Sequence, residues 1–220
     1  TSVSTVDGDL FSDLNDPALP VIDSVSINAN GYAVIGWNAS TSQDVSAYLI
    51  YQNVGGINIV IDTVYGINNV FYTNLSSFAN AGSESYLVAA SDSCGNLSNI
   101  APLQKTLYLT KQYSICQYAV NLSWNAYVGM GDGGLDHYSI YVSLNGGPFT
   151  ILTNVTSTSF SHSGLVNGNS YCYFIRAFSA GGNITSTSNQ QCITAQTPNQ
   201  PTYVYLKRVT VNNNTSVDVD

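Results

Sequence analysis

Charged side chains are scarce in this 220-residue chain, where Asp, Glu, Lys and Arg together make up 8% of the sequence. A soluble domain usually has about 25%. The net charge is −8, and the only basic residues are Lys105, Lys111, Arg176, Lys207 and Arg208. Because nucleic acids and anionic membrane surfaces are bound through clustered Lys and Arg, this composition argues against both kinds of partner. No apolar run approaches the length of a membrane-spanning helix, so we expect no membrane insertion.

Strong helix formers are also few. The chain has one Met, and its only Glu is Glu84. In their place stand 16 Tyr and 7 Phe with many Val, Ile and Thr, which favour strands over helices. With 44% hydrophobic residues, the chain is too apolar for a disordered protein and can bury one large core or two smaller ones. We therefore predict an all-β fold.

Residues with catalytic potential are isolated in the sequence. The two histidines are His137, beside Asp136, and His162 in a predicted turn. A general base needs a nucleophile positioned beside it, and no nucleophile motif such as GxSxG is present. A glycosidase needs two carboxylates across a cleft, whereas Glu84 has no second Glu and most Asp residues lie in predicted turns. We therefore predict a non-enzymatic protein without catalytic residues or a cofactor-binding site.

Two segments allow more than one interpretation. Residues 7–16 (DGDLFSDLND) hold four Asp, but their spacing departs from an EF-hand loop, which favours a solvated linker over a calcium site. Residues 128–136 (VGMGDGGLD) are rich in Gly but lack the Lys-Ser/Thr of a phosphate-binding loop. This second segment is either a partner-binding loop or a flexible connection. We predict no metal site in either.

An internal repeat organises the chain. GYAVIGWNAS (31–40) matches YAVNLSWNAY (118–127), which places Trp37 and Trp124 87 residues apart. AYLIYQNVGG also matches HYSIYVSLNGG, and SYLVAASDSCGN matches SYCYFIRAFSAGGN. Three blocks in the same order indicate two copies of a domain of about 85–90 residues.

Each copy has the pattern of short strands joined by turns. In SYCYFIRAF, alternation predicts one strand with Tyr171, Tyr173, Ile175 and Ala177 on one face and Cys172, Phe174 and Arg176 on the other. Gly-Gly pairs follow the repeated blocks and indicate hairpin turns. Short strands at regular spacing around one Trp are typical of a β-sandwich.

Each copy resembles a fibronectin type III domain. Trp37 and Trp124 stand where that family has its core Trp, and GLVNGNSYCYFIRAFSAGG resembles the family's Leu-x-x-x-x-x-Tyr stretch through Leu165 and Tyr171. There the Tyr ties strand F to the preceding loop. Tyr86 is the counterpart in the first copy, where FANAGSESY departs from the Leu spacing.

This resemblance implies tandem immunoglobulin-like (fibronectin type III) β-sandwiches at residues 20–104 and 105–196, after an N-terminal linker at 1–19. The last stretch, QPTYVYLKRVTVNNNTSVDVD, has the layout of the first two strands of a third domain. We expect residues 197–220 to be this truncated third domain, interrupted just before its core Trp.

A narrower resemblance rests on an ordered set of motifs. PVIDSVSIN, IDTVYG, AASDSCGN, LSWNAY, IYVSLNGGPF, YCYFIRAFSAGGN and QPTYVYLKRV together resemble the fibronectin-type region of gliding-motility-associated C-terminal-domain proteins. These are large secreted or surface-anchored proteins exported by the type IX secretion system. The sorting domain that defines them does not occur in this sequence. The resemblance implies an extracellular or cell-surface location and a role in adhesion.

The four cysteines favour disulfides and an oxidising compartment, because they are too far apart for a zinc site. On the resembled fold, Cys172 starts strand F and Cys192 ends strand G, so these two should face each other within disulfide reach. Cys94 and Cys116 remain. We expect them to form a bond at the domain junction, with free or intermolecular thiols as the alternative.

The function that we predict is a structural and adhesive spacer in a secreted or cell-surface protein, with other protein domains or neighbouring subunits as partners. One alternative is a subunit of an extracellular filament assembled by strand exchange. Another is a carbohydrate-binding accessory module with glycans as partners. In bacteria of the resembled group, O-glycans are attached at Asp-Ser/Thr followed by an aliphatic residue, which makes Ser24 and Thr63 candidate O-glycosylation sites of a glycoprotein.

Overall fold

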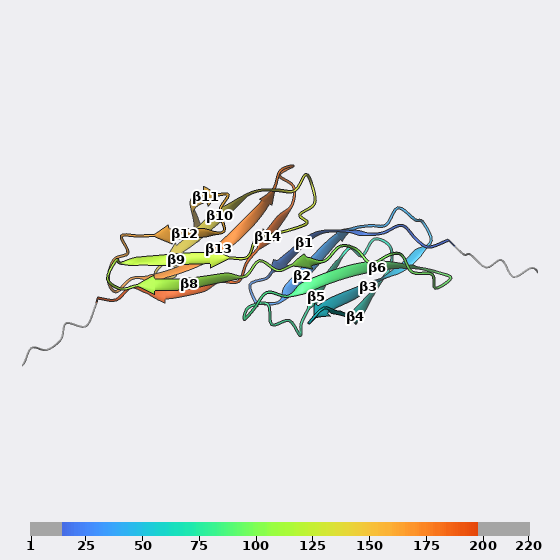
Figure 1. The fold of residues 1–220 in the computed structure, drawn as a ribbon, viewed down its shortest axis with the longest axis horizontal. Helices are drawn as coiled ribbons and strands as arrows, with labels where there is room; N and C mark the ends of the chain where they lie inside the picture. The colour runs from blue at the N-terminus through green and yellow to red at the C-terminus, as the bar shows by residue number, and fades with distance from the viewer. Residues whose placement is uncertain (1–14, 198–220) are drawn as a thin grey trace, which may run out of the picture.

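The computed structural model describes residues 15–197, and every regular element in this part of the chain is a β-strand. The strands pair antiparallel into four sheets, which form two sandwiches laid end to end (Figure 1). The predicted all-β fold class is confirmed. Within residues 15–197 no helix is long and apolar enough to span a membrane.

The first sandwich packs a three-stranded sheet on a four-stranded one. The strand order is β1-β2-β5 in the first sheet and β4-β3-β6-β7 in the second. The bounds are β1 Val21–Ile27, β2 Ala33–Asn38, β3 Val45–Val54, β4 Ile57–Tyr65, β5 Phe71–Asn74, β6 Ser85–Asp92 and β7 Gln104–Lys105. This three-plus-four arrangement is the fibronectin type III-like sandwich that the sequence implied.

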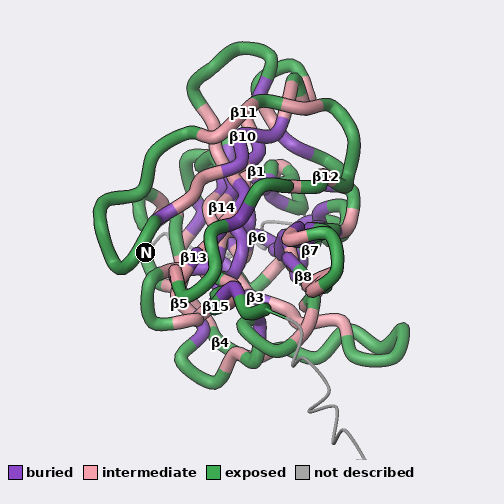
Figure 2. The backbone as a smooth tube through the Cα atoms, turned by 90° about the vertical axis from the view of Figure 1, so that its left-hand side faces the viewer, coloured by how far each residue is buried: buried purple, intermediate pink, exposed green. Residues whose placement is uncertain are grey.

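The second sandwich packs a three-stranded sheet on a five-stranded one. One sheet has the order β12-β9-β8, and the other has the order β11-β10-β13-β14 with β15 also pairing to β13. The bounds are β8 Leu109–Ser114, β9 Ala119–Trp124, β10 Leu135–Leu144, β11 Thr150–Val155, β12 Ser159–His162, β13 Ser170–Ser179, β14 Thr185–Thr187 and β15 Gln191–Thr194. Viewed along the long axis, buried segments lie at the centre and exposed loops surround them (Figure 2).

Alternation of apolar side chains builds each core. In β13, Tyr171, Tyr173, Ile175 and Ala177 are buried, whereas the residues between them are half-exposed, as predicted. Each large side chain removed from water stabilises the fold by about 1.5–3 kcal/mol. The two cores share no residue, since one is built from positions 22 to 101 and the other from 107 to 195.

The repeated Trp is the centre of each core. Trp37 and Trp124 are 1% and 6% exposed and meet Tyr48 and Tyr138 edge to face, with ring centroids 5.3 and 5.5 Å apart. The two tyrosine hydroxyls make equivalent hydrogen bonds. That of Tyr48 accepts the Ser40 N–H at 3.0 Å, and that of Tyr138 accepts the Tyr127 N–H at 2.9 Å. The repeat is therefore preserved at the level of single hydrogen bonds.

The two copies secure the start of their central strand differently. In the second, Leu165 is buried and the Tyr171 hydroxyl accepts the Val166 N–H at 3.0 Å. In the first, the Tyr86 hydroxyl donates to Glu84 Oε2 at 2.7 Å and accepts a hydrogen bond from Asn74. A carboxylate thus replaces the backbone contact where the Leu spacing is missing.

The cysteines divide into one bridge and two thiols. Cys172 and Cys192 form a disulfide between directly opposed residues of β13 and β15, with Cα atoms 4.0 Å apart. The expected bond between Cys94 and Cys116 is wrong, because both are free and exposed. Cys94 follows β6 and Cys116 lies in the β8–β9 turn, and Figure 1 shows these segments at opposite ends of the molecule. A disulfide needs Cα atoms within about 7 Å, so this arrangement agrees with the alternative of free thiols.

Some expectations lie outside the described residues. The proposed third-domain strands fall in 198–220, and most of the acidic stretch 7–16 falls in 1–14. Of that stretch, Asp16 is described and is exposed just before β1.

Candidate functional site at the junction of the two sandwiches

The first sandwich presents the edge strand β1 to the second sandwich. The Val25 N–H donates to the Tyr127 hydroxyl at 2.7 Å, and Ser186 Oγ donates to the Val25 carbonyl at 2.6 Å. One residue further along, the Thr187 N–H donates to Ser26 Oγ at 3.2 Å. Because Val25 and Ser186 are fully buried, these bonds are shielded from water. The junction thereby satisfies backbone groups that an open sheet edge would expose.

Gln104 is the second part of the junction. Its side chain is 4% exposed, and its amide donates to the Ile22 carbonyl at 2.7 Å and to the Gly129 carbonyl. Its Oε1 accepts the Tyr127 hydroxyl at 3.4 Å. One buried amide therefore joins the last strand of the first sandwich, its first strand and a loop of the second.

Tyr127 connects these two groups of contacts. Burial raises the pKa of its hydroxyl to about 12, since the phenolate would have to lose its water shell, although the Val25 N–H favours the charged form. The side chain is 5% exposed. At neutral pH the hydroxyl stays protonated, accepts from the first sandwich and donates to Gln104.

The loop 128–136 is fixed at the junction. Met130 is buried in the second core, and the Gly131 N–H donates to the Asp23 carbonyl at 3.3 Å. Asp132 Oδ2 accepts from Ser179 Oγ at 3.0 Å and from the Asn183 N–H at 3.0 Å. The Asn183 N–H, followed by the Ser179 hydroxyl, lowers the pKa of this carboxyl.

Gly181, in the Gly-Gly pair after β13, packs closely against this loop. A Cβ on Gly181 would lie 2.1 Å from Asp132 Oδ1, so a larger residue there would displace the Asp132 side chain from its present position. Residues 128–136 therefore form a loop that is held by specific contacts, which does not agree with the interpretation as a flexible connection. Its binding of an external partner stays a prediction.

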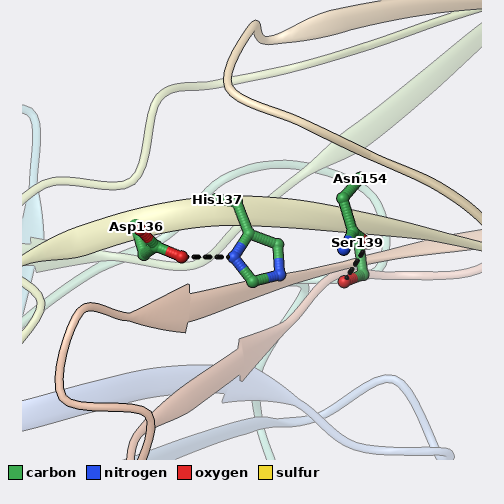
Figure 3. A network of polar contacts seen from close by, with 4 residues as sticks. All are labelled: Asp136, His137, Ser139 and Asn154. Atoms are coloured by element: carbon green, nitrogen blue, oxygen red, sulfur yellow. Dashed lines mark hydrogen bonds and ion pairs between the residues drawn. The ribbon is translucent and has the colours of Figure 1, made fainter.

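The candidate general base His137 makes its hydrogen bond to a carboxylate, and within residues 15–197 it makes none to a serine or threonine hydroxyl. Its Nδ1 lies 2.7 Å from Oδ2 of the neighbouring Asp136, and Figure 3 shows this pair on the surface of β10. Ser139, two residues on, donates its hydroxyl to Asn154 Oδ1 at 2.9 Å instead. The His137 ring stacks on Phe178 at 4.9 Å. Asp, His and Ser are thus near one another in sequence without forming a proton-transfer chain.

The remaining candidates have structural partners. His162 Nδ1 lies 2.8 Å from the Tyr173 hydroxyl, and burial lowers the pKa of its imidazole. Glu84 Oε1 accepts the Phe78 N–H at 2.8 Å, and its Oε2 accepts the Ser77 hydroxyl at 2.6 Å. Glu84 thus orders the loop before β6. In residues 15–197, no group of three or more His, Cys, Asp or Glu is placed to hold a metal ion.

The O-glycosylation hypotheses stay predictions. Ser24 is half-buried in β1, and its hydroxyl donates to Asp23 Oδ1 at 3.0 Å. Thr63 is half-buried on the edge strand β4.

Gln104 and Tyr127 are the functional residues that the sequence did not single out. One signal was present: the repeated triplet Trp-Asn-Ala is followed by Ser40 in the first copy and by Tyr127 in the second. Both residues donate their N–H to the equivalent core Tyr, so only the side chain differs. Tyr127 is the large amphipathic residue that only the second copy has at this position, and its hydroxyl contacts the first sandwich.

Comparisons with known proteins give distant relatives, and no family model matches the chain. Exoglucanase B of Cellulomonas fimi is 29% identical over 210 residues, which cover 85% of this chain and 18% of the relative. Chitinase A1 of Niallia circulans is 27% identical over 182 residues, covering 76% of this chain and 24% of the relative. The chain thus spans less than a quarter of either relative.

Two of the solved structures with detectable similarity consist of fibronectin domains. The FN1–FN3 domains of chicken CNTN1 are 15% identical, cover 82% of this chain and 68% of their own, and have a TM-score of 0.35. A fibronectin type III domain of the human KIAA0970 protein is 15% identical, covers 44% of this chain and 78% of its own, and also scores 0.35. These scores are low, so the description of the fold rests on the strand order given above.

Proposed function

We propose that this chain is a non-catalytic spacer in a secreted or cell-surface protein, holding neighbouring domains at a fixed separation and orientation. The observation that supports this role is the junction of buried hydrogen bonds through Gln104 and Tyr127. Tandem domains joined by a flexible linker alone would turn freely. Here rotation would break bonds from buried groups, which costs about 1–3 kcal/mol for each unsatisfied group.

Two further observations support the setting. The Cys172–Cys192 disulfide favours an oxidising, extracellular compartment. The relatives carry the names of an exoglucanase and a chitinase, and the chain aligns to a small part of each. We infer that the parent protein presents other domains to a polysaccharide or to a cell surface.

The two free thiols provide the test. Spin labels attached to Cys94 and Cys116 in the intact chain report the distance between the outer ends of the two sandwiches by double electron–electron resonance. We expect one narrow distance distribution. Gln104→Ala should broaden it because the two hydrogen bonds from Gln104 to Gly129 and Tyr127 across the junction are lost, whereas the matched control Gln112→Ala, on an exposed position of β8, should leave it unchanged. A broad distribution in the unmodified chain would contradict the spacer role.

A filament subunit is the second candidate, and the first sandwich has one feature that favours it. β4 is an edge strand of its sheet, and Ile57, Ile59 and Val60 on it are 68%, 49% and 49% exposed. A long apolar edge is a site where another chain can add a strand. Electron microscopy of the purified chain at increasing concentration checks this: polymers that Ile59→Lys abolishes would support assembly, and monomers throughout would exclude it.

A finer proposal concerns export. The ordered motifs that resemble gliding-motility-associated C-terminal-domain proteins support secretion through the type IX system and a role in adhesion. The parent gene tests this directly, since a C-terminal sorting domain encoded downstream would support it and a catalytic domain without one would oppose it.

A further inference from the structure

A cleft of about 620 Å³ opens between the two sandwiches. Its first wall is the β1–β2 turn of the first sandwich with the nearby Asn80, and its other side is the outer face of β13 with the segment that follows β14. A volume of this size is typical of a site for a small molecule. The cleft exists only because the junction holds the two sandwiches together.

Among the described residues, Arg176 on β13 is the only charged one that lines this cleft. Its guanidinium carbon lies 5.3 Å from the centre of the Tyr141 ring and 5.6 Å from that of Phe174, and its Nε donates to Thr187 Oγ1 at 3.2 Å. These contacts fix the side chain before any ligand arrives. In the described part of the chain, the only ion pair joins Asp136 and His137, so Arg176 has no carboxylate partner there.

Phe149 gives the cleft an apolar surface beside this charge. It is 37% exposed and meets Phe174 edge to face at 4.8 Å. The negatively polarised face of an aromatic ring attracts the weakly positive C–H groups of a sugar ring, and the contact removes apolar surface from water. A ligand held here would lie against Phe149 with its charge toward Arg176.

The wall contributed by the first sandwich is made of amides. Asn28 Oδ1 accepts the N–H groups of Asn30 and Tyr32, both at 3.0 Å, which fixes the turn. Asn30 and Asn80 are exposed at the cleft and offer both donors and acceptors. Groups that both donate and accept match the hydroxyls of a sugar, whereas the single cation matches one carboxylate.

We propose that this cleft binds an acidic saccharide, a uronic acid unit of a glycan, whose carboxylate pairs with Arg176 while its ring lies on Phe149. A peptide rich in Asp or Glu fits less well, because its side chains offer no hydroxyls to the amides of Asn30 and Asn80. The proposal rests on the fixed junction of the spacer role, because residues of both sandwiches line the cleft. The two fail distinguishably: a broad interdomain distance distribution would remove both, whereas a narrow one without binding would exclude the saccharide site alone.

Calorimetric titration of the intact chain tests the proposal with three probes: trigalacturonic acid, the neutral cellotriose and triglutamate. We expect saturable binding of trigalacturonic acid alone, weakened by salt. Arg176→Gln should reduce its affinity roughly 10- to 150-fold, as loss of a charge-assisted contact does. Phe149→Ala should also weaken binding. The matched controls Lys105→Gln, which removes one charge outside the cleft, and Phe71→Ala, which removes an exposed ring from β5, should bind like the unmodified chain.

Several results would overturn the proposal. Equal binding of cellotriose would show that Arg176 does not select the ligand, and equal binding of triglutamate would point to an acidic peptide. No binding of trigalacturonic acid would exclude the site. If Arg176→Gln fails to fold, Arg176→Lys keeps the charge without the planar fork, and unaltered affinity in that variant would contradict the carboxylate pairing.

Discussion

Removal of one hydroxyl at the junction gives the sharpest test of how the two sandwiches are coupled. Tyr127→Phe keeps the ring in place but leaves the Val25 N–H without its acceptor at 2.7 Å. Val25 is fully buried, so water cannot replace the lost partner in the closed state. The hydrogen bond from Tyr127 to Gln104 Oε1 disappears as well.

The magnitude follows from the cost of a buried donor without a partner. That cost is about 1–3 kcal/mol, which corresponds to a rise of about 5- to 140-fold in the population of the open junction. Amide hydrogen exchange of the intact chain, followed by NMR, measures this population at individual residues. The exchange rate of the Val25 amide should rise by that factor, whereas the Ala90 amide, bonded to Ser98 within the first core, should keep its rate.

Tyr48→Phe is the matched control. It removes an equally buried hydroxyl that accepts the Ser40 N–H at 3.0 Å, but this bond lies within the first sandwich. Exchange at Ser40 should rise and exchange at Val25 should not. If Tyr127→Phe leaves the Val25 rate unchanged while Tyr48→Phe accelerates Ser40, the junction does not hold the sandwiches together and our reasoning is refuted.

Three further predictions concern stability. Replacing both Cys172 and Cys192 by Ser should destabilise the second sandwich by about 3 kcal/mol in urea titrations, and dithiothreitol should have the same effect on the unmodified chain; no effect would contradict a chain-entropy role. Glu84→Ala should destabilise the first sandwich by about 2–3 kcal/mol, because the N–H of Phe78 and the hydroxyls of Ser77 and Tyr86 lose a charged acceptor. The lowered pKa of Asp132 stabilises the fold above the ordinary carboxyl pKa of about 3.9, and this stabilisation is lost as the pH falls below that value. Asp132→Asn should therefore flatten the decline of the melting temperature between about pH 5 and 3. An unchanged slope would count against this role of Asp132.

Most of the fold could be predicted from the sequence because the two sandwiches repeat the same pattern of residues. The matched blocks around Trp37 and Trp124, and the alternation in β13, follow from side-chain burial within one sandwich. Burial repeats every second residue along a strand and leaves a pattern that can be recognised. The disulfide between Cys172 and Cys192 followed from the same register.

The junction left a much weaker pattern. The junction contacts of β1 join positions about 100 or more residues apart, such as Val25 with Tyr127 and with Ser186, and a single polar side chain on a strand edge has no periodicity. The mistaken pairing of Cys94 with Cys116 has the same origin, since it required knowing how the sandwiches meet. The cleft around Arg176 depends on how the two sandwiches meet at the junction, so the sequence alone could not predict it either.

The covalent bridge between β13 and β15 has a mechanical consequence. A pull on the chain beyond residue 197 enters the second sandwich through β15, and the disulfide passes the load at Cys192 directly to Cys172 on β13. The residues between Cys172 and Cys192 therefore bear no load, even when the second sandwich unfolds. With a sequence separation of 20 residues, this shortens the extension released on rupture by about 70 Å. Under tension, the second sandwich therefore releases a shorter length of chain when it unfolds than the first, whose described residues contain no disulfide.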